Sequence, residues 1–422
     1  MKITTIGLGY IGLPTSILFA THGHQVVGVD VSPTVVEKLN QGFIHIEEEG
    51  LQALYNEALA IGNFEAALTP AHADAYIVAV PTPNMEDRYK SCDLSYVESA
   101  IRSIIPYLTA GNIVIVESTI APRTMEDVVQ PMLEQAGFTI GEDLYLAHCP
   151  ERVLPGNIAY ELVYNPRIIG GVTPNCTAQT KAVYQTVVQG ELIEATASEA
   201  ELSKLMENTY RDVNIALANE LAKIGTDLHI NALKVIEMAN RHPRVNLHSP
   251  GPGVGGHCLA VDPYFVAAAS PDFSPLIQTA REINSSMPAF VVDATKQLMQ
   301  EAPTNKITVF GLTYKGNIDD TRESPAMEIA EMLAFQGFDV AAYDPHVASA
   351  TLTIEEACQD SSLILVLTDH FEFQIIDSKA TAKMAAPRVF DTKNVVKTLA
   401  SDVTRMDFGS MYTYMQTALA KQ

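Results

Sequence analysis

The stretch KITTIGLGYIG (2–12) decides the fold of this chain. An apolar, β-type run leads directly into GLGYIG, and a helical run follows it. In this setting Gly7 permits a tight turn, Gly9 lets the backbone approach a pyrophosphate, and Gly12 lets helix and strand pack closely. The N-terminus of the helix would then face the phosphates. The motif predicts a dinucleotide-binding domain; the alternative is a bare structural turn.

Asp30 supports the dinucleotide interpretation. It ends the next predicted strand, QVVGVD (25–30), where a carboxylate can bind both ribose hydroxyls. It would also repel a 2′-phosphate, and no basic residue immediately follows it. The sequence therefore favours NAD over NADP.

The C-terminal part repeats this pattern, since KITVFGLTYKG (306–316) echoes residues 2–12. Thr313 stands in place of the second glycine, so close approach to a pyrophosphate is lost, and Lys315 is gained. Arg322 adds a second cation on the following turn, unless it forms only a surface charge pair. We expect this part to bind a phosphorylated ligand, but not a dinucleotide in the same pose.

Short runs of continuous apolar residues alternate with helical stretches at both ends of the chain, which is typical of parallel strands buried on both faces. The predicted strands are 3–7, 25–30, 75–80, 112–117, 144–150, 306–311, 339–345, 363–369 and 387–392. Between them, 196–240 has helical spacing, with Thr196–Glu199 and Ser198–Glu201 as equal candidates for a capping box. A second helical stretch covers 275–300.

These patterns predict an α/β fold with two doubly wound Rossmann-like domains joined by a central helical domain that contains a long helix. The expected boundaries are 1–195 for the NAD-binding domain, 196–300 for the central domain and 301–422 for the second Rossmann-like domain.

Composition narrows the class of protein. The 422 residues are 47% hydrophobic and 18% charged, with a net charge of −23. So acidic a chain should repel nucleic acid and anionic membranes, and an anionic substrate would need a local cluster of Lys and Arg. The apolar N-terminal run lacks a signal-peptide pattern, and no other run is long enough to span a membrane. Five scattered cysteines without a CxxC motif indicate a reducing cytoplasm.

The stretch PGPGVGGHCLAVDP (250–263) places Cys258 beside His257 after a glycine-rich run. Gly255 and Gly256 would let a ligand come close, and a nearby cation would stabilise a thiolate. Asp262 would be within reach if a helix begins there. His257 is either a base or a hydrogen-bonding wall, and the alternative for Cys258 is a small buried hydrophobe. We expect no metal, because further ligands at useful spacing are missing.

Lys204, Asn208 and Arg211 lie at i, i+4 and i+7 of the predicted long helix and share one face. Such a stripe is often only a solvated face. The mixture of Lys, Asn and Arg differs from the Glu/Lys pairing that solvated helices prefer, which favours a functional role.

The chain resembles the UDP-glucose/GDP-mannose dehydrogenase family from about residue 1 to 400. The motifs that carry the resemblance are GLGYIGLP, VPTP (80–83), EST (117–119), CPERVLPG (149–156), ELSKLMENTYRDVNIALANE (201–220), PGPGVGGHCLAVDP and TYKGNIDDTRESPAMEIA. PGPGVGGHC is similar to the branch that acts on UDP-N-acetylhexosamines, and NRHPRVN to the members that act on UDP-N-acetyl-D-mannosamine. Arg123 departs from the pattern, since the family often has glycine there.

The resemblance implies oxidation of the sugar's C6 alcohol to a carboxylate, with two NAD reduced per turnover, for synthesis of surface polysaccharide precursors. Cys258 would capture the intermediate aldehyde as a thiohemiacetal, which is oxidised to a thioester and hydrolysed. UDP-N-acetylglucosamine or UDP-glucose is the alternative substrate. A two-electron dehydrogenase of the hydroxyacid or 6-phosphogluconate kind and a non-catalytic NAD-responsive protein are the rival functions.

The resemblance also implies roles for individual residues. Lys204 would exchange the proton at the sugar oxygen with Asn208 beside it, Asp262 and Glu151 would serve hydrolysis, and Thr119 would lie near the nicotinamide. The expected cofactor contacts are Gly7, Gly9, Tyr10, Ile11, Gly12, Asp30, Thr82, Thr119 and Arg322. The expected UDP-sugar contacts are Arg152, Val153, Lys204, Asn208, Arg211, His242, Arg244, Gly253, Tyr314 and Lys315. The central helices would form a homodimer, or part of a higher oligomer, in which the Arg244 loop reaches the neighbouring subunit's site.

Overall fold

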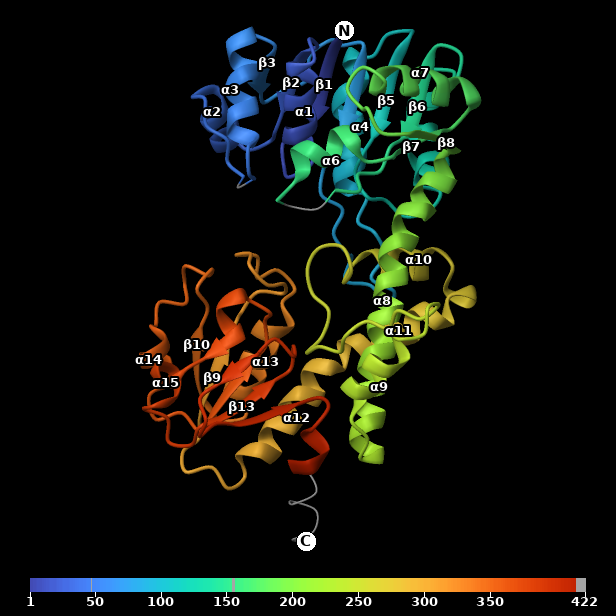
Figure 1. Cartoon of the computed structure of the whole chain (residues 1–422). Coiled ribbons are helices and arrows are strands. Elements are labelled where there is room, and N and C mark those ends of the chain that lie inside the picture. Colours follow the sequence, from blue (N-terminus) through green and yellow to red (C-terminus); the bar gives the residue numbers. More distant parts are fainter. Residues whose placement is uncertain (47, 154–155, 415–422) are drawn as a thin grey trace. The chain divides into compact units, whose positions relative to one another are not determined.

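The computed structural model describes residues 1–46, 48–153 and 156–414. The described residues form two compact units. The N-terminal unit comprises Met1–Glu207 and Tyr264–Pro271, and the C-terminal unit comprises Asn208–Pro263 and the chain from Asp272 onwards. The boundary between the units falls within one continuous helix, drawn as α8 in Figure 1. The three-domain division expected from sequence stays a prediction.

The N-terminal unit is built on a sheet of eight strands in the order β3-β2-β1-β4-β5-β6-β7-β8. Every neighbouring pair is parallel except β6 and β7. The strands are β1 (Lys2–Ile6), β2 (Gln25–Val29), β3 (Phe64–Ala67), β4 (Ala75–Val78), β5 (Asn112–Val116), β6 (Leu144–His148), β7 (Arg167–Gly171) and β8 (Leu192–Thr196). The order reverses between β1 and β4, which is the point where doubly wound sheets bind ligands.

Helices cover both faces of this sheet. One buried cluster joins it to α1 (Gly12–Thr21), α3 (Leu51–Ile61) and α6 (Ile158–Tyr164), and a second joins it to α4 (Ser95–Ile104) and α5 (Gln130–Gln135). The remaining helices are α2 (Pro33–Asn40), α7 (Pro174–Tyr184), the 3₁₀ turn η1 (Ile105–Tyr107) and the π-helix η2 (Met125–Val129). Burial on both faces explains why the strands read as continuous apolar runs.

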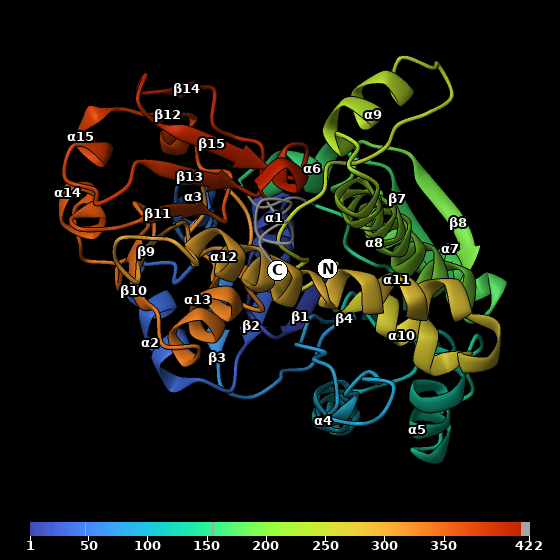
Figure 2. The ribbon, with the colours of Figure 1, turned by 90° about the horizontal axis from the view of Figure 1, so that it is seen from below.

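The C-terminal unit contains a parallel sheet in the order β10-β9-β11-β13-β15 and a small sheet of β12 and β14. The strands are β9 (Lys306–Phe310), β10 (Asp339–Tyr343), β11 (Leu363–Val366), β12 (Ile375–Ile376), β13 (Arg388–Asp391), β14 (Thr398–Leu399) and β15 (Thr404–Asp407). Figure 2 shows α12 (Met287–Met299) and α13 (Pro325–Phe335) on one side of this sheet, and α14 (Ile354–Cys358) and α15 (Ser378–Thr381) on the other. The short turns η3 (Pro271–Phe273) and η4 (Phe371–Gln374) complete the list. The predicted α/β fold with two mainly parallel sheets and a long central helix is therefore confirmed.

The sequence echo corresponds to the same local structure in both sheets. Gly7 has φ 92° and donates to Val29 O at 2.8 Å, and Gly311 has φ 90° and donates to Tyr343 O at 2.9 Å. Glycine is required at both because this left-handed region disfavours a side chain. The two parts of the chain thus turn out of their first strand in the same way.

The long helix α8 runs from Ala197 to Leu228. Thr196 and Glu199 form the capping box, with Thr196 N donating to the Glu199 carboxylate at 2.8 Å and Glu199 N donating to Thr196 Oγ1 at 3.3 Å. The Ser198–Glu201 alternative is wrong, because Glu201 binds other backbone groups. After α8 come His229, with φ 58°, and then α9 (Ala232–Ala239).

Three further helices, α10 (Asp262–Ala269), α11 (Pro275–Ser285) and α12, follow the glycine-rich loop. The stretch predicted as helical over 275–300 divides at Ser286. Pro288 explains the division, because it lacks the N–H that a continuous helix would need there. In the described part of the chain, no helix combines the length and apolarity needed to cross a membrane.

Candidate active site

The GLGYIG turn joins β1 to α1 at the switch point of the N-terminal sheet. A Cβ at Gly12 would collide with Gly7 O, and one at Gly7 would collide with Ala79 O, so both glycines are required by packing. A Cβ at Gly9 would meet nothing within 4 Å. Gly9 therefore faces open space, as the approach of a pyrophosphate requires. Of the two residues that follow, Tyr10 is exposed and Ile11 is half-buried.

Asp30 directly follows β2 and is half-buried. Its Oδ2 accepts from Leu8 N at 3.1 Å and its Oδ1 accepts from Ser32 N at 2.9 Å. These two N–H groups fix the carboxylate beside the glycine turn. Each oxygen keeps further acceptor capacity, which ribose hydroxyls can use.

The loops that follow β4 and β5 are joined by hydrogen bonds. Thr82 Oγ1 donates to Thr119 O at 2.6 Å, and Ser118 Oγ both donates to Val80 O at 2.8 Å and accepts from Val80 N at 2.9 Å. The structure thus brings together Thr82 and Thr119, two residues that were predicted to contact the cofactor.

Arg123 lies in the loop after Thr119 and has φ 70°. This is the left-handed region that glycine favours, which gives a physical reason for the glycine common at this position in the family. Its side chain forms ion pairs with Glu126 at 2.7 Å and Asp127 at 2.7 Å.

Glu151 belongs to a buried network that the sequence reasoning missed. Arg167 Nη1 contacts Glu151 Oε2 at 2.7 Å, and the same guanidinium pairs with Glu117. Tyr184 donates to Glu117 Oε1 at 2.6 Å. Burial raises the pKa of the Glu117 carboxyl, and Arg167 opposes that shift. A signal was present, because an arginine that begins an apolar strand such as RIIGG must find a buried partner.

Arg152 and Val153 follow Glu151. The guanidinium of Arg152 pairs with Glu207 at 2.9 Å, and Val153 packs against the core of the N-terminal unit. A phosphate at Arg152 would therefore compete with Glu207.

The polar residues of α8 differ in burial. Lys204 is 8% exposed and Asn208 is 9% exposed, whereas Arg211 is exposed. In the N-terminal unit, burial lowers the pKa of His148 to about 3, and the charge of Lys204 contributes to this shift. In the C-terminal unit Asn208 Nδ2 donates to the buried Asp262 Oδ2 at 2.6 Å. Lys204 and Asn208 thus do not belong to a solvated stripe.

Cys258 is exposed, whereas Cys92, Cys149, Cys176 and Cys358 are buried. Cys258 O accepts from Val261 N at 3.1 Å and from Asp262 N at 2.8 Å, and α10 begins at Asp262, as its predicted reach requires. The buried-hydrophobe alternative for Cys258 is therefore wrong.

Gly255 and Gly256, which precede Cys258, lie in close contact with a neighbouring loop. A Cβ at Gly255 would collide with Glu323 O, and one at Gly256, which has φ 83°, would collide with the ring of Tyr314. Gly256 N donates to Arg322 O at 3.2 Å. These glycines let the loop that contains Tyr314 and Arg322 pack close, a role that the sequence did not predict, and the expectation that they also let a ligand come close stays a prediction.

Charged side chains near the contact between Gly256 and the loop of Tyr314 and Arg322 shift the pKa values of their neighbours. Arg322 binds Asp320 through Nε at 2.8 Å and Nη2 at 2.6 Å. Partial burial, followed by the charge of Arg322, lowers the pKa of His257. Burial, followed by the charges of Asp320 and Cys258, raises the pKa of Tyr314. His257 therefore stays neutral at neutral pH and can serve as a hydrogen-bonding wall.

The other predicted UDP-sugar residues are placed as follows. His242, Arg244 and Lys315 are exposed, and Arg244 N donates to His242 Nδ1 at 3.3 Å. Gly253 has φ 144°, and a Cβ there would meet Pro325 at 2.9 Å.

The C-terminal counterpart of Asp30 is Asp344, which accepts from Leu312 N at 2.7 Å and from His346 N at 2.9 Å. Unlike Asp30 it is buried, and it contacts His370 Nε2 at 3.1 Å. The place where a ribose would bind is thus occupied by a histidine. This explains structurally why the second sheet does not repeat the dinucleotide site.

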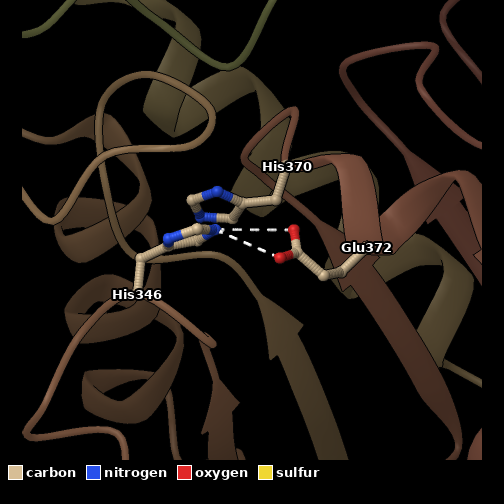
Figure 3. A group of neighbouring side chains, drawn as sticks. All are labelled: His346, His370 and Glu372. Carbon is tan, nitrogen blue, oxygen red and sulfur yellow. Dashed lines mark hydrogen bonds and ion pairs between the residues drawn. The ribbon is translucent and has the colours of Figure 1, made fainter. Parts of the chain in front are cut away.

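Figure 3 shows His346, His370 and Glu372 as neighbours, close enough for three metal ligands. His370 Nδ1 accepts from Asn317 N at 2.8 Å, so its proton lies on Nε2, which faces Asp344. Both nitrogens of His370 are therefore engaged, and its ring stacks on His346 at 4.6 Å. This arrangement suits a packed polar contact better than a metal centre.

Comparisons with known proteins identify the family of this chain. Residues 1–188 match the NAD binding domain, 198–286 the central domain and 308–398 the UDP binding domain of the UDP-glucose/GDP-mannose dehydrogenase family. A UDP-N-acetyl-D-mannosamine dehydrogenase of Methanococcus maripaludis is 44% identical, covering 94% of this chain and 93% of its own. The Escherichia coli enzyme of that name is 44% identical, covering 89% and 95%.

Solved structures give the same result. The UDP-N-acetyl-mannosamine dehydrogenase from S. aureus is 58% identical with a TM-score of 0.93, covering 98% of this chain and 100% of its own. A UDP-glucose dehydrogenase from Pyrobaculum islandicum is 26% identical with a TM-score of 0.82, covering 97% of each chain. This chain belongs to the UDP-glucose/GDP-mannose dehydrogenase family.

Proposed function

We propose that this protein is an NAD-dependent UDP-N-acetyl-D-mannosamine 6-dehydrogenase that oxidises the C6 alcohol of its substrate to a carboxylate through a covalent bond to Cys258. The observation that carries the proposal is the exposed thiol at Cys258 in a chain whose other four cysteines are buried. The relatives of that name, each at least 44% identical over most of the chain, support the choice of sugar. Relatives named NDP-N-acetyl-D-galactosaminuronic acid dehydrogenase, at 42% identity, favour an N-acetylhexosamine over glucose.

The reaction needs two oxidations at one carbon. NAD, when bound, would supply the hydride acceptor for each oxidation, so two NAD would be consumed per turnover. Lys204 takes the hydroxyl proton in the first oxidation, which leaves an aldehyde. The Cys258 thiolate adds to that aldehyde, and the new oxyanion takes a proton to give a thiohemiacetal. In the second oxidation the thiohemiacetal loses a hydride from carbon and the hydroxyl proton to Lys204, which gives a thioester, and water then releases the carboxylic acid and regenerates the thiol.

The other residues support these steps. Asn208 holds Asp262 at 2.6 Å, so Asp262 is fixed as a carboxylate for handling the hydrolytic water. Glu151 is held by Arg167 at 2.7 Å as a further carboxylate for that step. Gly9, Asp30, Thr82, Thr119 and Arg322 contact the dinucleotide, with Tyr10 and Ile11 at the same turn.

The diphosphate of the substrate requires local positive charge in a chain of net charge −23. Arg211, Arg244 and Lys315 are exposed and supply it, with Arg152, His242, Gly253 and Tyr314 as further contacts. Tyr314 and Lys315 lie within residues 308–398, whose match to the family's UDP binding domain supports their part of this assignment.

A second copy of the chain completes the assembly. The exposed apolar residues of α8 fall on one face, at Leu202, Met206, Tyr210, Leu217, Ile224 and Leu228. This stripe supports a homodimer in which the α8 helices pack together, with the Arg244 loop reaching the partner's site. We place the enzyme in the cytoplasm, in the supply of precursors for surface polysaccharides.

Counting NADH formed per UDP-N-acetyl-D-mannosamine consumed tests the proposal. Two NADH per sugar and a uronate product are expected. A ratio of one would replace the proposal with a two-electron dehydrogenase, and no turnover of any UDP-sugar would favour an NAD-responsive binding protein. Side-by-side assays with UDP-N-acetylglucosamine and UDP-glucose decide the sugar.

A further inference from the structure

Four polar side chains are buried between α8 and α11 in the C-terminal unit, and none of them was expected to serve the site. Asp212 and Asn219 on α8 are 0% exposed, and Arg281 and Asn284 on α11 are 5% and 1% exposed. Arg281 Nη1 contacts Asp212 Oδ1 at 2.6 Å. A buried ion pair adds little stability compared with apolar residues of the same volume, because both charges are desolvated. Its presence therefore points to a role other than stability.

The four side chains form one connected network. Asn284 Nδ2 donates to Asp212 Oδ1 at 2.8 Å and to Asp212 O at 3.0 Å. Asn219 Nδ2 donates to Asn284 Oδ1 at 2.8 Å. Because the amides and the ion pair share atoms, moving one member disturbs the others.

This network holds the loop that carries Cys258 at two points. Asn219 Oδ1 accepts from Gly251 N at 2.9 Å, at the start of the glycine-rich run. Arg281 Nη1 donates to Leu259 O at 3.3 Å, and Leu259 directly follows Cys258. The backbone is thus held on both sides of the thiol.

The same face of α8 holds a third point. Asn208, Asp212 and Asn219 lie at i, i+4 and i+11, which places them on one face of the helix. Asn208 binds Asp262, the first residue of α10. One face of α8 therefore binds the loop before Cys258 and the helix that follows it directly, and it reaches Leu259 through Arg281 of α11.

The loop needs such support. Neither a helix nor a strand lies between the end of α9 at Ala239 and the start of α10 at Asp262. The stretch PGPGVGG within it is rich in glycine, which loses the most conformational freedom on ordering. Without side-chain contacts, the loop would sample many positions of the thiol.

We propose that Arg281 and Asp212 are positioning residues, and that their buried ion pair fixes the backbone on both sides of Cys258 so that the thiol meets the reacting carbon. The inference rests on the proposed role of Cys258 as nucleophile. It assigns no contact with substrate or cofactor to either residue.

The test compares Arg281→Met with wild type and with Arg388→Met. Arg388 is a matched control, because it is half-buried and donates to two backbone carbonyls, Ser362 O at 3.1 Å and Leu298 O at 2.8 Å, in the C-terminal sheet region. The first measurement is the rate at which iodoacetamide alkylates Cys258 in the full chain without substrate or NAD, followed by mass spectrometry across a pH series. The second is kcat with its KM values for NAD and sugar.

In Arg281→Met we expect the rate and pH profile of Cys258 alkylation to change, and kcat to fall by about tenfold or more, since misplacement by about 1 Å can cost about 100-fold. KM for NAD should stay the same. Arg281→Lys, which keeps a donor for Asp212, should recover part of kcat. Arg388→Met should leave alkylation unchanged.

The double variant Arg281→Met with Asp212→Leu guards against misfolding, because replacing both charges by apolar residues usually preserves stability. If this folded variant matches wild type in alkylation and kcat, the pair has only a structural role and the inference is wrong. If instead Cys258→Ala still forms two NADH per sugar, the proposed role of Cys258 is wrong. A changed alkylation profile of Cys258 in Arg281→Met would then still show that the ion pair positions the loop.

Discussion

Burial gives the five thiols of this chain different chemistry. Cys149 and Cys358 are buried, and burial raises the pKa of each to about 12. Such thiols hold almost no thiolate at neutral pH and do not act as nucleophiles. Cys258 is exposed and lies next to His257 and near the charged pair of Arg322 and Asp320. Its exposure makes Cys258 the candidate nucleophile among the five cysteines.

Replacing Cys258 by alanine should abolish acid formation and leave NAD affinity nearly unchanged, because the thiol reacts with the sugar and not with the dinucleotide. Uronate formation and a calorimetric NAD titration measure the two effects. Cys358→Ala, which removes a buried thiol from the C-terminal unit, should retain turnover. Strong uronate formation by Cys258→Ala would remove the residue from this role.

Arg244 is an exposed cation on the loop between α9 and α10. Arg244→Ala should raise KM for the UDP-sugar by about tenfold or more, since a hydrogen bond to a charged group contributes about 1.5–3 kcal/mol. Steady-state kinetics with varied sugar measures the effect. Arg241→Ala is the control, because Arg241 lies in the same loop, is also exposed and pairs with Glu237 of α9 at 3.2 Å. Equal KM values in the two variants would exclude Arg244 from the diphosphate site.

Among the secondary-structure elements, the first turn of α8 is joined to the loop that follows Thr119. The Glu201 carboxylate accepts from Arg123 N at 2.5 Å and from Met125 N at 2.8 Å. Burial, opposed by these two N–H groups, raises its pKa from 4.5 to about 7, and Glu126 and Asp127 add to the rise. Glu201 thus titrates near neutral pH while it holds a loop expected to lie beside the nicotinamide.

The raised pKa makes stability depend on pH. Between pH 4.5 and about 7 the unfolded chain loses the Glu201 proton while the folded chain keeps it. Its contribution to the free energy of unfolding is therefore complete below pH 4.5 and is lost as pH rises through about 7. At about 1.4 kcal/mol per pH unit, the free energy of unfolding falls by at most about 3.5 kcal/mol over this range.

In Glu201→Gln this pH dependence should disappear, because glutamine does not titrate. Urea unfolding of wild type and variant at several pH values measures the difference. Glu220→Gln, an exposed position on the same helix, should leave the slope unchanged. Parallel curves for wild type and Glu201→Gln would contradict the assignment.

For the whole molecule, α8 has two different faces. Lys204, Asn208, Asp212 and Asn219 are buried on one face, while the apolar stripe from Leu202 to Leu228 is exposed on the other. Tyr210 at 61% and Leu217 at 48% exposure lie within this stripe. An apolar stripe along so long a helix is typical of an interface with a second helix.

Tyr210→Glu combined with Leu217→Glu should convert a dimer into monomers, because two charges would be desolvated at the contact. Light scattering after size-exclusion chromatography measures the mass. Phe335→Glu is the control, since Phe335 is 91% exposed on α13 and lies outside the stripe. A wild-type protein that is monomeric, or a double variant that stays dimeric, would refute the α8 interface.

Local sequence was enough to predict the turn at Gly7–Gly12, the carboxylate at Asp30 and most of the central strands. Turn geometry depends on neighbouring residues, and strands buried on both faces leave continuous apolar runs. β7 and β8 were missed because their signal is weaker: RIIGG begins with a charge and ends in two glycines, and β8 has exposed positions at Ile193 and Glu194.

The sequence by itself determined where the backbone turns and which residues are candidates for the chemistry, since these follow from residue type and local spacing. Tertiary structure alone decided which buried charges are paired, Glu117 and Glu151 with Arg167 and Asp212 with Arg281, whereas Asp344 accepts a hydrogen bond from His370. It also decided that Gly255 and Gly256 serve the packing of Tyr314. The physical reason is that desolvation and close packing depend on partners far apart in the chain, and local periodicity carries no information about those partners.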